Sequence, residues 1–318
     1  MTKIPESNHS TAALIDAHHE SKREKPRPHL GGSMLGHHCD RWLWLSFRWA
    51  VVEQFPGRIL RLFRRGHNEE STVVDDLRAI GCDITDHEAE GGQWRVDFGK
   101  HVSGSIDGAI TQGLPESPKT KHLLEIKTHS KKSFDDLEKK GVEKSKPMHW
   151  AQMQVYMAGT GLERAFYAAV CKDDDRYYFE RVCYDEAAAN SFIERGHNMT
   201  MSNRMPEPCI GAMADWYQCK FCAAHSFCHG DQTAKEINCR TCAHYTAKPD
   251  STSHCARWDA TIPLEAQYDG CPSHVVHPDL IPYKLIDGDG INAVYDVDGR
   301  RVVNGEGGIS SKELVNAS

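Results

Sequence analysis

Cysteine is the residue that most constrains this chain, because twelve cysteines occur among 318 residues and seven of them fall between positions 219 and 271. Disulfides rarely persist in a reducing compartment, so clustered cysteines there indicate metal ligands. The N-terminus has no continuous apolar stretch of the kind a signal peptide needs. No uncharged apolar run approaches the roughly 18–20 residues that span a bilayer. We therefore expect a cytoplasmic protein with metal centres and no membrane partner.

The first cysteine set has the spacing CxxC-x5-C and consists of Cys219, Cys222 and Cys228. Three thiolates cannot complete a tetrahedral site, so a fourth ligand must come from elsewhere. Cys39 is the candidate, although it lies far earlier in the chain, and a zinc site completed by His225 or His229 is the alternative. Thiolates suit both zinc and iron–sulfur clusters, so the spacing alone leaves the metal open.

The second set comprises Cys239, Cys242, Cys255 and Cys271. Its spacing allows one tetrahedral zinc ion, as in a small ribbon, with His244, His254 and His274 as alternative ligands. The plain alternative is four unlinked buried cysteines, which a CxxC pair beside two further cysteines disfavours. The other four cysteines are expected to be ordinary buried thiols: Cys82, Cys171, Cys183 and Cys209.

Charge is unevenly spread along the chain. Residues 66–118 carry a net charge of −8, between the basic segments 1–65, with +5, and 119–150, with +4. A carboxylate-rich centre with basic rims suits a metal-dependent enzyme that acts on a phosphate polymer, whereas the plain alternative is solvated faces without a partner. No GxxxxGK[ST] motif occurs, which argues against an ATP-driven motor.

Apolar periodicity predicts a mixed α/β core. The expected helices cover residues 41–52, 58–80, 131–140, 147–159 and 185–203, and the expected strands cover residues 84–87, 94–98, 102–110, 122–128, 165–171 and 177–184. Residues 293–303 resemble a small hairpin. The order of elements is not that of a repeat protein.

A candidate catalytic set lies on two of these strands. Asp107 ends one strand, and Glu125 and Lys127 alternate around Ile126 on the next. Because strand side chains repeat every two residues, Glu125 and Lys127 share a face while Ile126 points into the core. Two carboxylates can hold Mg²⁺, and a lysine beside them can orient the attacking water. The alternative is an edge-strand salt bridge with Asp107 in a turn.

Three helical residues add to this set. His67 lies on the helix expected at 58–80, and Gln152 and Tyr156 stand four apart, hence on one helical face. Imidazole can complete a metal shell, and an amide and a phenol can grip a phosphate backbone. The alternatives are a surface histidine and an ordinary amphipathic helix.

The ordered set His67, Asp107, Glu125-Ile126-Lys127 and Gln152-x-x-x-Tyr156 resembles the RecB-like branch of the PD-(D/E)XK nuclease superfamily, over about residues 34–230. Ile106 departs from the family's proline before the aspartate. The resemblance implies an α/β fold with a restriction-endonuclease-like mixed sheet flanked by helices. It also implies that His67, Asp107, Glu125 and the Ile126 carbonyl ligate Mg²⁺ or Mn²⁺. Lys127 would position the water, and Gln152 and Tyr156 would contact DNA near the scissile phosphate.

One distant cysteine before this core and CxxC-x5-C after it resembles the iron-staple nucleases. These include the exonucleases of CRISPR adaptation and the nuclease domain of bacterial double-strand-break repair helicase–nucleases. The resemblance implies a 4Fe–4S cluster on Cys39, Cys219, Cys222 and Cys228. Its role would be structural, because a link from Cys39 to residue 219 closes a long loop and pins both ends of the core.

We therefore expect a mobile N-terminal arm at 1–33, a nuclease core with the staple at 34–232, a four-cysteine zinc module at 233–276, and a C-terminal hairpin and tail at 277–318. The expected activity is metal-dependent hydrolysis of DNA, by an exonuclease rather than an endonuclease. Single-stranded or end-bearing duplex DNA would be cleaved to 5′-phosphate and 3′-hydroxyl ends in recombination, repair or phage DNA processing. A recombination or replication protein is the expected partner, in the host cytoplasm if the gene is a phage's. The rival interpretations are a non-catalytic nucleic-acid-binding module on a nuclease-like fold and a zinc-binding scaffold.

Overall fold

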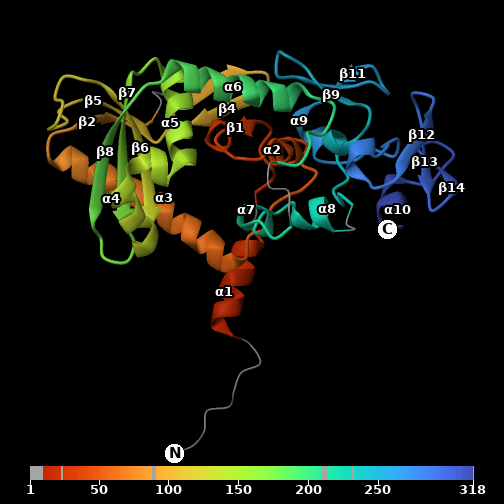
Figure 1. The fold of residues 1–318 in the computed structure, drawn as a ribbon, viewed down its shortest axis with the longest axis horizontal. Helices are drawn as coiled ribbons and strands as arrows, with labels where there is room; N and C mark the ends of the chain where they lie inside the picture. The colour runs from red at the N-terminus through yellow and green to blue at the C-terminus, as the bar shows by residue number, and fades with distance from the viewer. Residues whose placement is uncertain (1–9, 23, 88–90, 210–213, 231–232, 318) are drawn as a thin grey trace, which may run out of the picture.

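A five-stranded mixed sheet forms the centre of the computed structural model, which describes residues 10–22, 24–87, 91–209, 214–230 and 233–317 (Figure 1). Its strands lie in the order β2 (Asp83–Thr85), β5 (Gly108–Gln112), β6 (His122–His129), β7 (Arg164–Cys171) and β8 (Tyr177–Cys183). Only the β6–β7 pair in this sheet is parallel. The expected fold class, a mixed α/β structure with helices flanking a mixed sheet, is confirmed.

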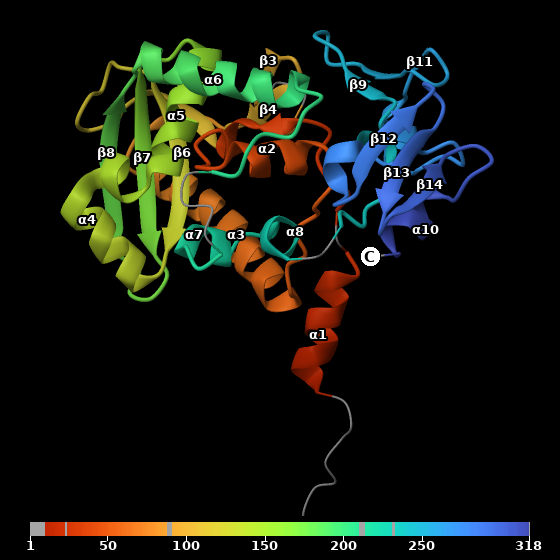
Figure 2. The ribbon, with the colours of Figure 1, turned by 45° about the vertical axis from the view of Figure 1, so that its right-hand side comes forward.

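Helices cover both faces of this sheet (Figure 2). One face packs on α3 (Gly57–Ala79), because Val73, Val74 and Leu77 of the helix meet the Leu124 and Ile126 side of β6. The other face packs on α4 (Lys131–Ser145) and α5 (Pro147–Thr160), with α6 (Glu186–Met201) beyond them. Helix α5 begins at a proline, whose fixed φ suits the first turn, and ends before Gly161, which takes the left-handed conformation at φ +70°.

A smaller sheet lies beside the main one in the order β1 (Leu30–Gly31), β4 (Val102–Ser105) and β3 (Arg95–Gly99). The chain passes from β4 in this sheet to β5 in the main sheet through Ile106 and Asp107. Asp107 is therefore held at the junction of the two sheets. The strand expected at 102–110 is broken there, because its two halves pair with different partners.

The N-terminal segment packs on the core where it is described. Helix α1 (Thr11–Glu20) lies against α3, where Asp16 pairs with Arg61 and the Glu20 carboxylate accepts a hydrogen bond from the Gly57 N–H at 2.7 Å. The 3₁₀ helix η1 (Gly32–Met34) leads into α2 (Asp40–Phe47). Residues 1–9 of the expected arm and the expected boundary at 232 lie outside the described residues.

The C-terminal third forms two small three-stranded sheets and short helices beside α2 (Figure 1). These elements are α7 (Tyr217–Lys220), α8 (His225–His229), η2 (Cys239–Thr241), β9 (Tyr245–Ala247), β10 (Ser253–Cys255), β11 (Ala260–Thr261), α9 (Leu264–Gln267), η3 (Pro278–Leu280), β12 (Lys284–Gly288), β13 (Ala293–Val297), β14 (Arg300–Asn304) and α10 (Ser311–Val315). The hairpin expected at 293–303 is present as β13 and β14. A separate apolar cluster joins Trp44 and Leu45 of α2 to Leu280, Tyr295 and Leu314. None of the described helices is long and apolar enough to cross a bilayer.

Candidate functional site

Strand β6 presents Glu125 and Lys127 on the face that packs toward α5. The Glu125 side chain has 0% exposure, and its Oε1 forms an ion pair with the Lys127 Nζ. The Lys127 side chain keeps 27% of its surface exposed, so the pair links the buried interior to solvent. Ile126 points to the opposite face, as the alternation of a strand predicts.

Asp107 reaches the same place from the junction between β4 and β5. Its Oδ2 accepts a hydrogen bond from the Ile126 N–H at 2.8 Å, which holds its carboxylate beside β6. The Ile126 carbonyl in turn accepts a hydrogen bond from Lys127 Nζ at 3.2 Å. The structure therefore brings together Asp107, Glu125 and Lys127, with the main chain of Ile126 between them.

Burial makes Glu125 an unusual carboxylate. It raises the pKa of Glu125 to about 7, an effect that Lys127 opposes and Asp107 reinforces. Apart from the ion pair with Lys127, neither carboxylate oxygen has a hydrogen-bond partner among the described residues. Because a buried charge is costly unless it is paired, these oxygens favour a cation beside them. Burial would lower the pKa of Lys127, but Glu125 and Asp107 outweigh that effect and raise it.

Glu70 is a third carboxylate at this site, and the sequence analysis missed it. It lies on α3 three residues after His67, whose Nδ1 is 3.4 Å from Glu70 Oε1. Burial and the nearby Asp107 raise the pKa of Glu70, while His67 and Lys127 oppose the shift. His67 itself is 73% exposed, so it stands at the rim and contacts the site through Glu70. The signal was available, because residues three apart share a helical face.

One face of α5 lines the other side. Gln152 and Tyr156 are both buried there, and His149 stands one turn earlier on the same face. Burial and the nearby Glu125 carboxylate raise the pKa of the Tyr156 phenol. The ring is held against two glycines, because a Cβ built on Gly104 or Gly32 would lie 2.8 or 2.7 Å from Tyr156 Cε1.

A buried tyrosine and two histidines extend this environment. Tyr167 stands opposite Glu125 in the parallel register of β6 and β7. Its hydroxyl is hydrogen-bonded to His129 Nε2 at 2.9 Å and to His149 Nδ1 at 2.8 Å. Burial lowers the pKa of His129 to about 4 and that of His149 to about 3, so both rings are neutral at physiological pH.

The first cysteine set lines one pocket. Cys39, which precedes α2 as its N-cap residue, faces the loop that carries Cys219, Cys222 and Cys228. Cys209 lines the same pocket, with its Sγ 3.9 Å from that of Cys219. Cys209, expected to be an ordinary buried thiol, is only partly buried and lies in this pocket beside Cys219. Cys183, also expected to be buried, is exposed.

Two polar groups around this pocket suit thiolates. The Arg41 side chain hydrogen-bonds Cys228, and the Ala224 N–H hydrogen-bonds Cys222; each contact opposes the rise in thiol pKa that burial causes. Burial, Cys39 and Cys219 together raise the pKa of Cys209 to about 12, which disfavours its thiolate. The donor chemistry of the pocket therefore fits a thiolate-bound metal centre.

The second cysteine set lines a separate pocket, formed by η2, β10 and the segment after α9. All twelve cysteines are free thiols. Within the described ranges, no three or more His, Cys, Asp and Glu side chains already converge as a ready-made ion site. Ion binding at the carboxylates or at either thiol pocket would therefore require side-chain adjustment.

Three solved structures are similar to this chain, each at low sequence identity. The crystal structure of LHK-Exo in complex with dAMP has 18% sequence identity and a TM-score of 0.37, and that of the alkaline exonuclease LHK-Exo from Laribacter hongkongensis has 19% and 0.34; each match covers 58% of this chain and 89% of the other. The crystal structure of SSO0001 has 14% identity and a TM-score of 0.40, over 71% of this chain and 100% of the other. No protein-family model and no curated protein matches the chain. Similarity at this level does not assign a function, which depends on the site itself.

The packing of the Tyr156 ring against Gly104 predicts an effect on stability that does not depend on any activity. Gly104→Ala is expected to push the Tyr156 ring off β4 and to lower the free energy of unfolding by about 1–3 kcal/mol, the usual cost of overpacking. Gly66→Ala in α3 is the matched control, since its new Cβ would meet only Thr128 Oγ1 at 3.8 Å. Urea denaturation of both variants measures the difference. Equal stability of the two variants would contradict the packing described here.

Proposed function

We propose that this protein is a metal-dependent deoxyribonuclease of the PD-(D/E)XK type, acting as an exonuclease. The observation that carries the proposal is the buried Glu125 carboxylate, which faces Asp107, pairs with Lys127 and has no other partner among the described residues. A simple Glu125–Lys127 salt bridge would not be stabilised by Asp107 and Glu70 beside it, because the three carboxylates repel one another. A divalent cation removes that repulsion.

The ligands proposed for Mg²⁺ or Mn²⁺ are Asp107, Glu125 and the Ile126 carbonyl, with Glu70 and His67 on the α3 side. These are oxygen donors of the kind that Mg²⁺ prefers, with one imidazole. When bound, the cation would polarise the phosphate and lower the pKa of the attacking water. The intact set of Asp107, Glu125 and Lys127 argues against a non-catalytic module on the same fold.

Lys127 supplies a fixed positive charge in this proposal. Its raised pKa keeps it protonated at neutral pH, so it orients water and neutralises phosphate rather than acting as a base. Water attacks phosphorus and the P–O3′ bond breaks, which leaves 5′-phosphate and 3′-hydroxyl ends. Gln152 and Tyr156 are proposed to contact the DNA backbone beside the scissile phosphate from α5.

We also propose that the first cysteine set holds a 4Fe–4S cluster on Cys39, Cys219, Cys222 and Cys228. Support comes from the shared pocket and from the polar contacts to Cys222 and Cys228. Such a cluster would tie the start of α2 to the segment that carries Cys219, Cys222 and Cys228. The closed loop would then contain the whole proposed nuclease core.

Substitution of the ion pair tests the activity. Glu125→Gln removes the charged metal ligand, and Lys127→Met removes the ammonium group that positions the water. Each is expected to lower the rate of DNA hydrolysis at least about 10³-fold. Glu125→Gln should remain folded, because Asp107 and Glu70 still lie near the Lys127 charge and the repulsion among the carboxylates falls. Lys121→Met, on the exposed approach to β6, is the matched control and should retain full activity. Substantial cleavage by both site variants would overturn the proposal.

The pKa of Glu125 predicts how the metal requirement depends on pH. Because its raised pKa is about 7, the carboxyl is mainly protonated below pH 7 and must lose that proton to bind the cation. The half-saturating Mg²⁺ concentration should therefore rise about tenfold per pH unit below 7 and level off above it. Glu125→Gln should bind Mn²⁺ only weakly at every pH and should show no such dependence. A flat wild-type profile between pH 5.5 and 8.5 would be incompatible with Glu125 as a ligand.

Metal analysis tests the cluster. Protein purified without oxygen should be brown and contain about four irons per chain. Cys39→Ser should lose the iron and melt at a lower temperature, since Cys39 is the cluster ligand proposed at the start of α2 and its loss breaks the link to the other three cysteines. Cys82→Ser, a buried cysteine outside both pockets, should keep the iron. Colourless protein with zinc in this pocket, from cells supplied with iron, would refute the cluster and leave the nuclease proposal standing.

A further inference from the structure

The second cysteine set forms a pocket whose donors come from separate parts of the chain. Its lining includes the four thiols and His244. Cys239 and Cys242 bracket η2, Cys255 ends β10, and Cys271 follows α9. Chance burial of unlinked cysteines would not gather them around one hollow.

Hydrogen bonds fix the turn that carries the first two thiols. The Asn238 Oδ1 accepts hydrogen bonds from the Arg240 and Thr241 N–H groups, at 2.9 and 3.2 Å, and Thr241 Oγ1 accepts one from the Asn238 N–H at 3.1 Å. This capping box sets the CxxC turn before any ligand is bound.

Backbone amides point at the Cys242 sulfur. The N–H groups of His244 and Val275 hydrogen-bond its Sγ. Such contacts are typical of metal-bound thiolates, because they orient the sulfur and stabilise its charge. A neutral cysteine buried among apolar groups would not require two hydrogen-bond donors at its sulfur.

The histidines around the pocket differ in availability. Both ring nitrogens of His274 are engaged, by Ser311 Oγ at 2.8 Å and by the Asn238 carbonyl at 3.0 Å. His244 hydrogen-bonds the Ile291 backbone, yet its Nε2 is buried without a hydrogen-bond partner among the described residues. A buried nitrogen in this state needs a partner, so His244 is the histidine that offers an alternative to one of the thiolates as a ligand.

We propose that Cys239, Cys242, Cys255 and Cys271 bind one structural zinc ion, independently of the nuclease activity. Four thiolates match the tetrahedral preference of zinc. Cys239 Sγ now lies 3.4 Å from the Ala266 carbonyl and 3.6 Å from that of Asp269, and the thiols do not yet meet at one point. Zinc binding would turn Cys239 from these oxygens into the pocket.

Zinc at this position would hold the module against α2. Arg240, between the first two cysteines, is 1% exposed, and it donates hydrogen bonds to the carbonyls of Phe47 at 2.9 Å and Pro28 at 2.7 Å. Its guanidinium lies 4.0 Å from the centre of the Trp49 ring. The cysteine turn thus inserts a buried cation at the C-terminal end of α2.

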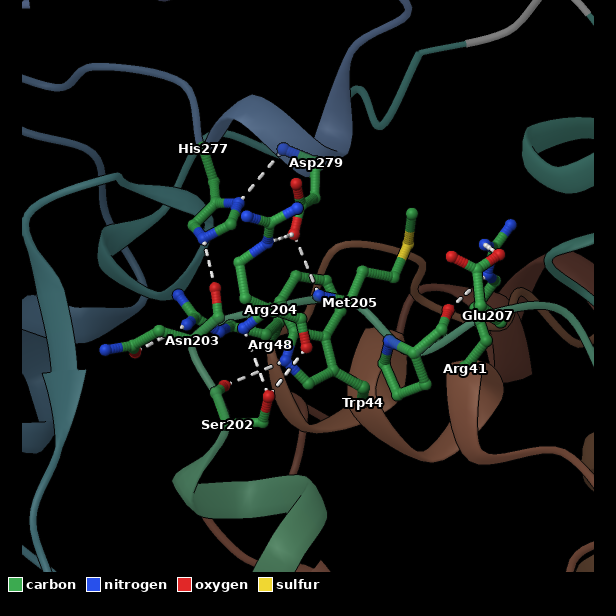
Figure 3. Close-up of polar contacts among 11 residues, drawn as sticks. Arg41, Trp44, Arg48, Ser202, Asn203, Arg204, Met205, Glu207, His277 and Asp279 are labelled. Carbon is green, nitrogen blue, oxygen red and sulfur yellow. Dashed lines mark hydrogen bonds and ion pairs between the residues drawn. The ribbon is translucent and has the colours of Figure 1, made fainter.

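A second buried arginine, Arg48, adds to the contacts between the cysteine module and α2. Arg48 donates hydrogen bonds to the Arg240 carbonyl and to Asn203 Oδ1, both at 3.1 Å, and Figure 3 shows Asn203 between Arg48 and His277. Neither arginine has an ion pair in the described part of the chain, so the structure buries two like charges against carbonyls and aromatic rings. Zinc binding would supply free energy that offsets this cost.

Metal content of the full chain tests the proposal. The wild type should retain about one zinc per chain at this set, and Cys242→Ser should lose it while keeping its iron. Cys171→Ser, a buried cysteine on β7, should keep both metals. If the first set also held zinc, Cys242→Ser should still lose one equivalent and only one. Absence of zinc in the wild type, or full zinc in Cys242→Ser, would overturn the site.

Two further measurements keep the proposal falsifiable if Cys242→Ser fails to fold. Thiol modification of the wild type should release about one zinc per chain to a chromogenic chelator. Cobalt exchange into the wild type should give intense sulfur-to-cobalt charge-transfer absorption, and its absence would contradict thiolate ligation. Zinc retained in Cys271→Ser but lost in His244→Ala would overturn the four-thiolate assignment.

Discussion

The burial of a carboxylate on a central strand is the constraint on which this structure depends most. Glu125 has no exposed surface, and its charge is compensated by Lys127 two residues away on the same face of β6. The strand must lie between β5 and β7 for this burial, and Asp107 must reach the Ile126 N–H from the junction of two sheets. Three carboxylates therefore gather beside one lysine, and the surplus negative charge favours a divalent cation there.

Helix α2 has a comparable role in holding the rest of the chain together. Its N-cap residue, Cys39, lies in the first cysteine pocket, while Arg48 and Trp49 beyond its C-terminal end meet the turn of the second. The two cysteine sets thus act on opposite ends of one short helix. This arrangement explains how the C-terminal segment packs on the α/β core through buried arginines as well as through an apolar interface.

The sequence predicted most elements of the fold, and it predicted that Glu125 and Lys127 share one face of β6, because the alternation along 122–128 determines which side chains share a face. It missed Glu70, whose position depends on where α3 crosses β6, although its spacing from His67 was a usable signal. It also missed Cys209 and the buried pair Arg48 and Arg240. Their positions follow from loop paths and from packing between distant segments, which neither periodicity nor spacing encodes. The roles of all the site residues remain predictions: His67, Asp107, Glu125, Lys127, Gln152 and Tyr156.

The most direct measurement of the central claim is anomalous scattering from crystals of the protein soaked with Mn²⁺. We expect one manganese peak bounded by the carboxylates of Asp107 and Glu125 and the carbonyl of Ile126, with Glu70 on its α3 side. Crystals of Glu125→Gln should lack this peak under the same soak. A site that stays without manganese while the Glu125–Lys127 ion pair persists unchanged would contradict the claim that this buried carboxylate is a metal ligand.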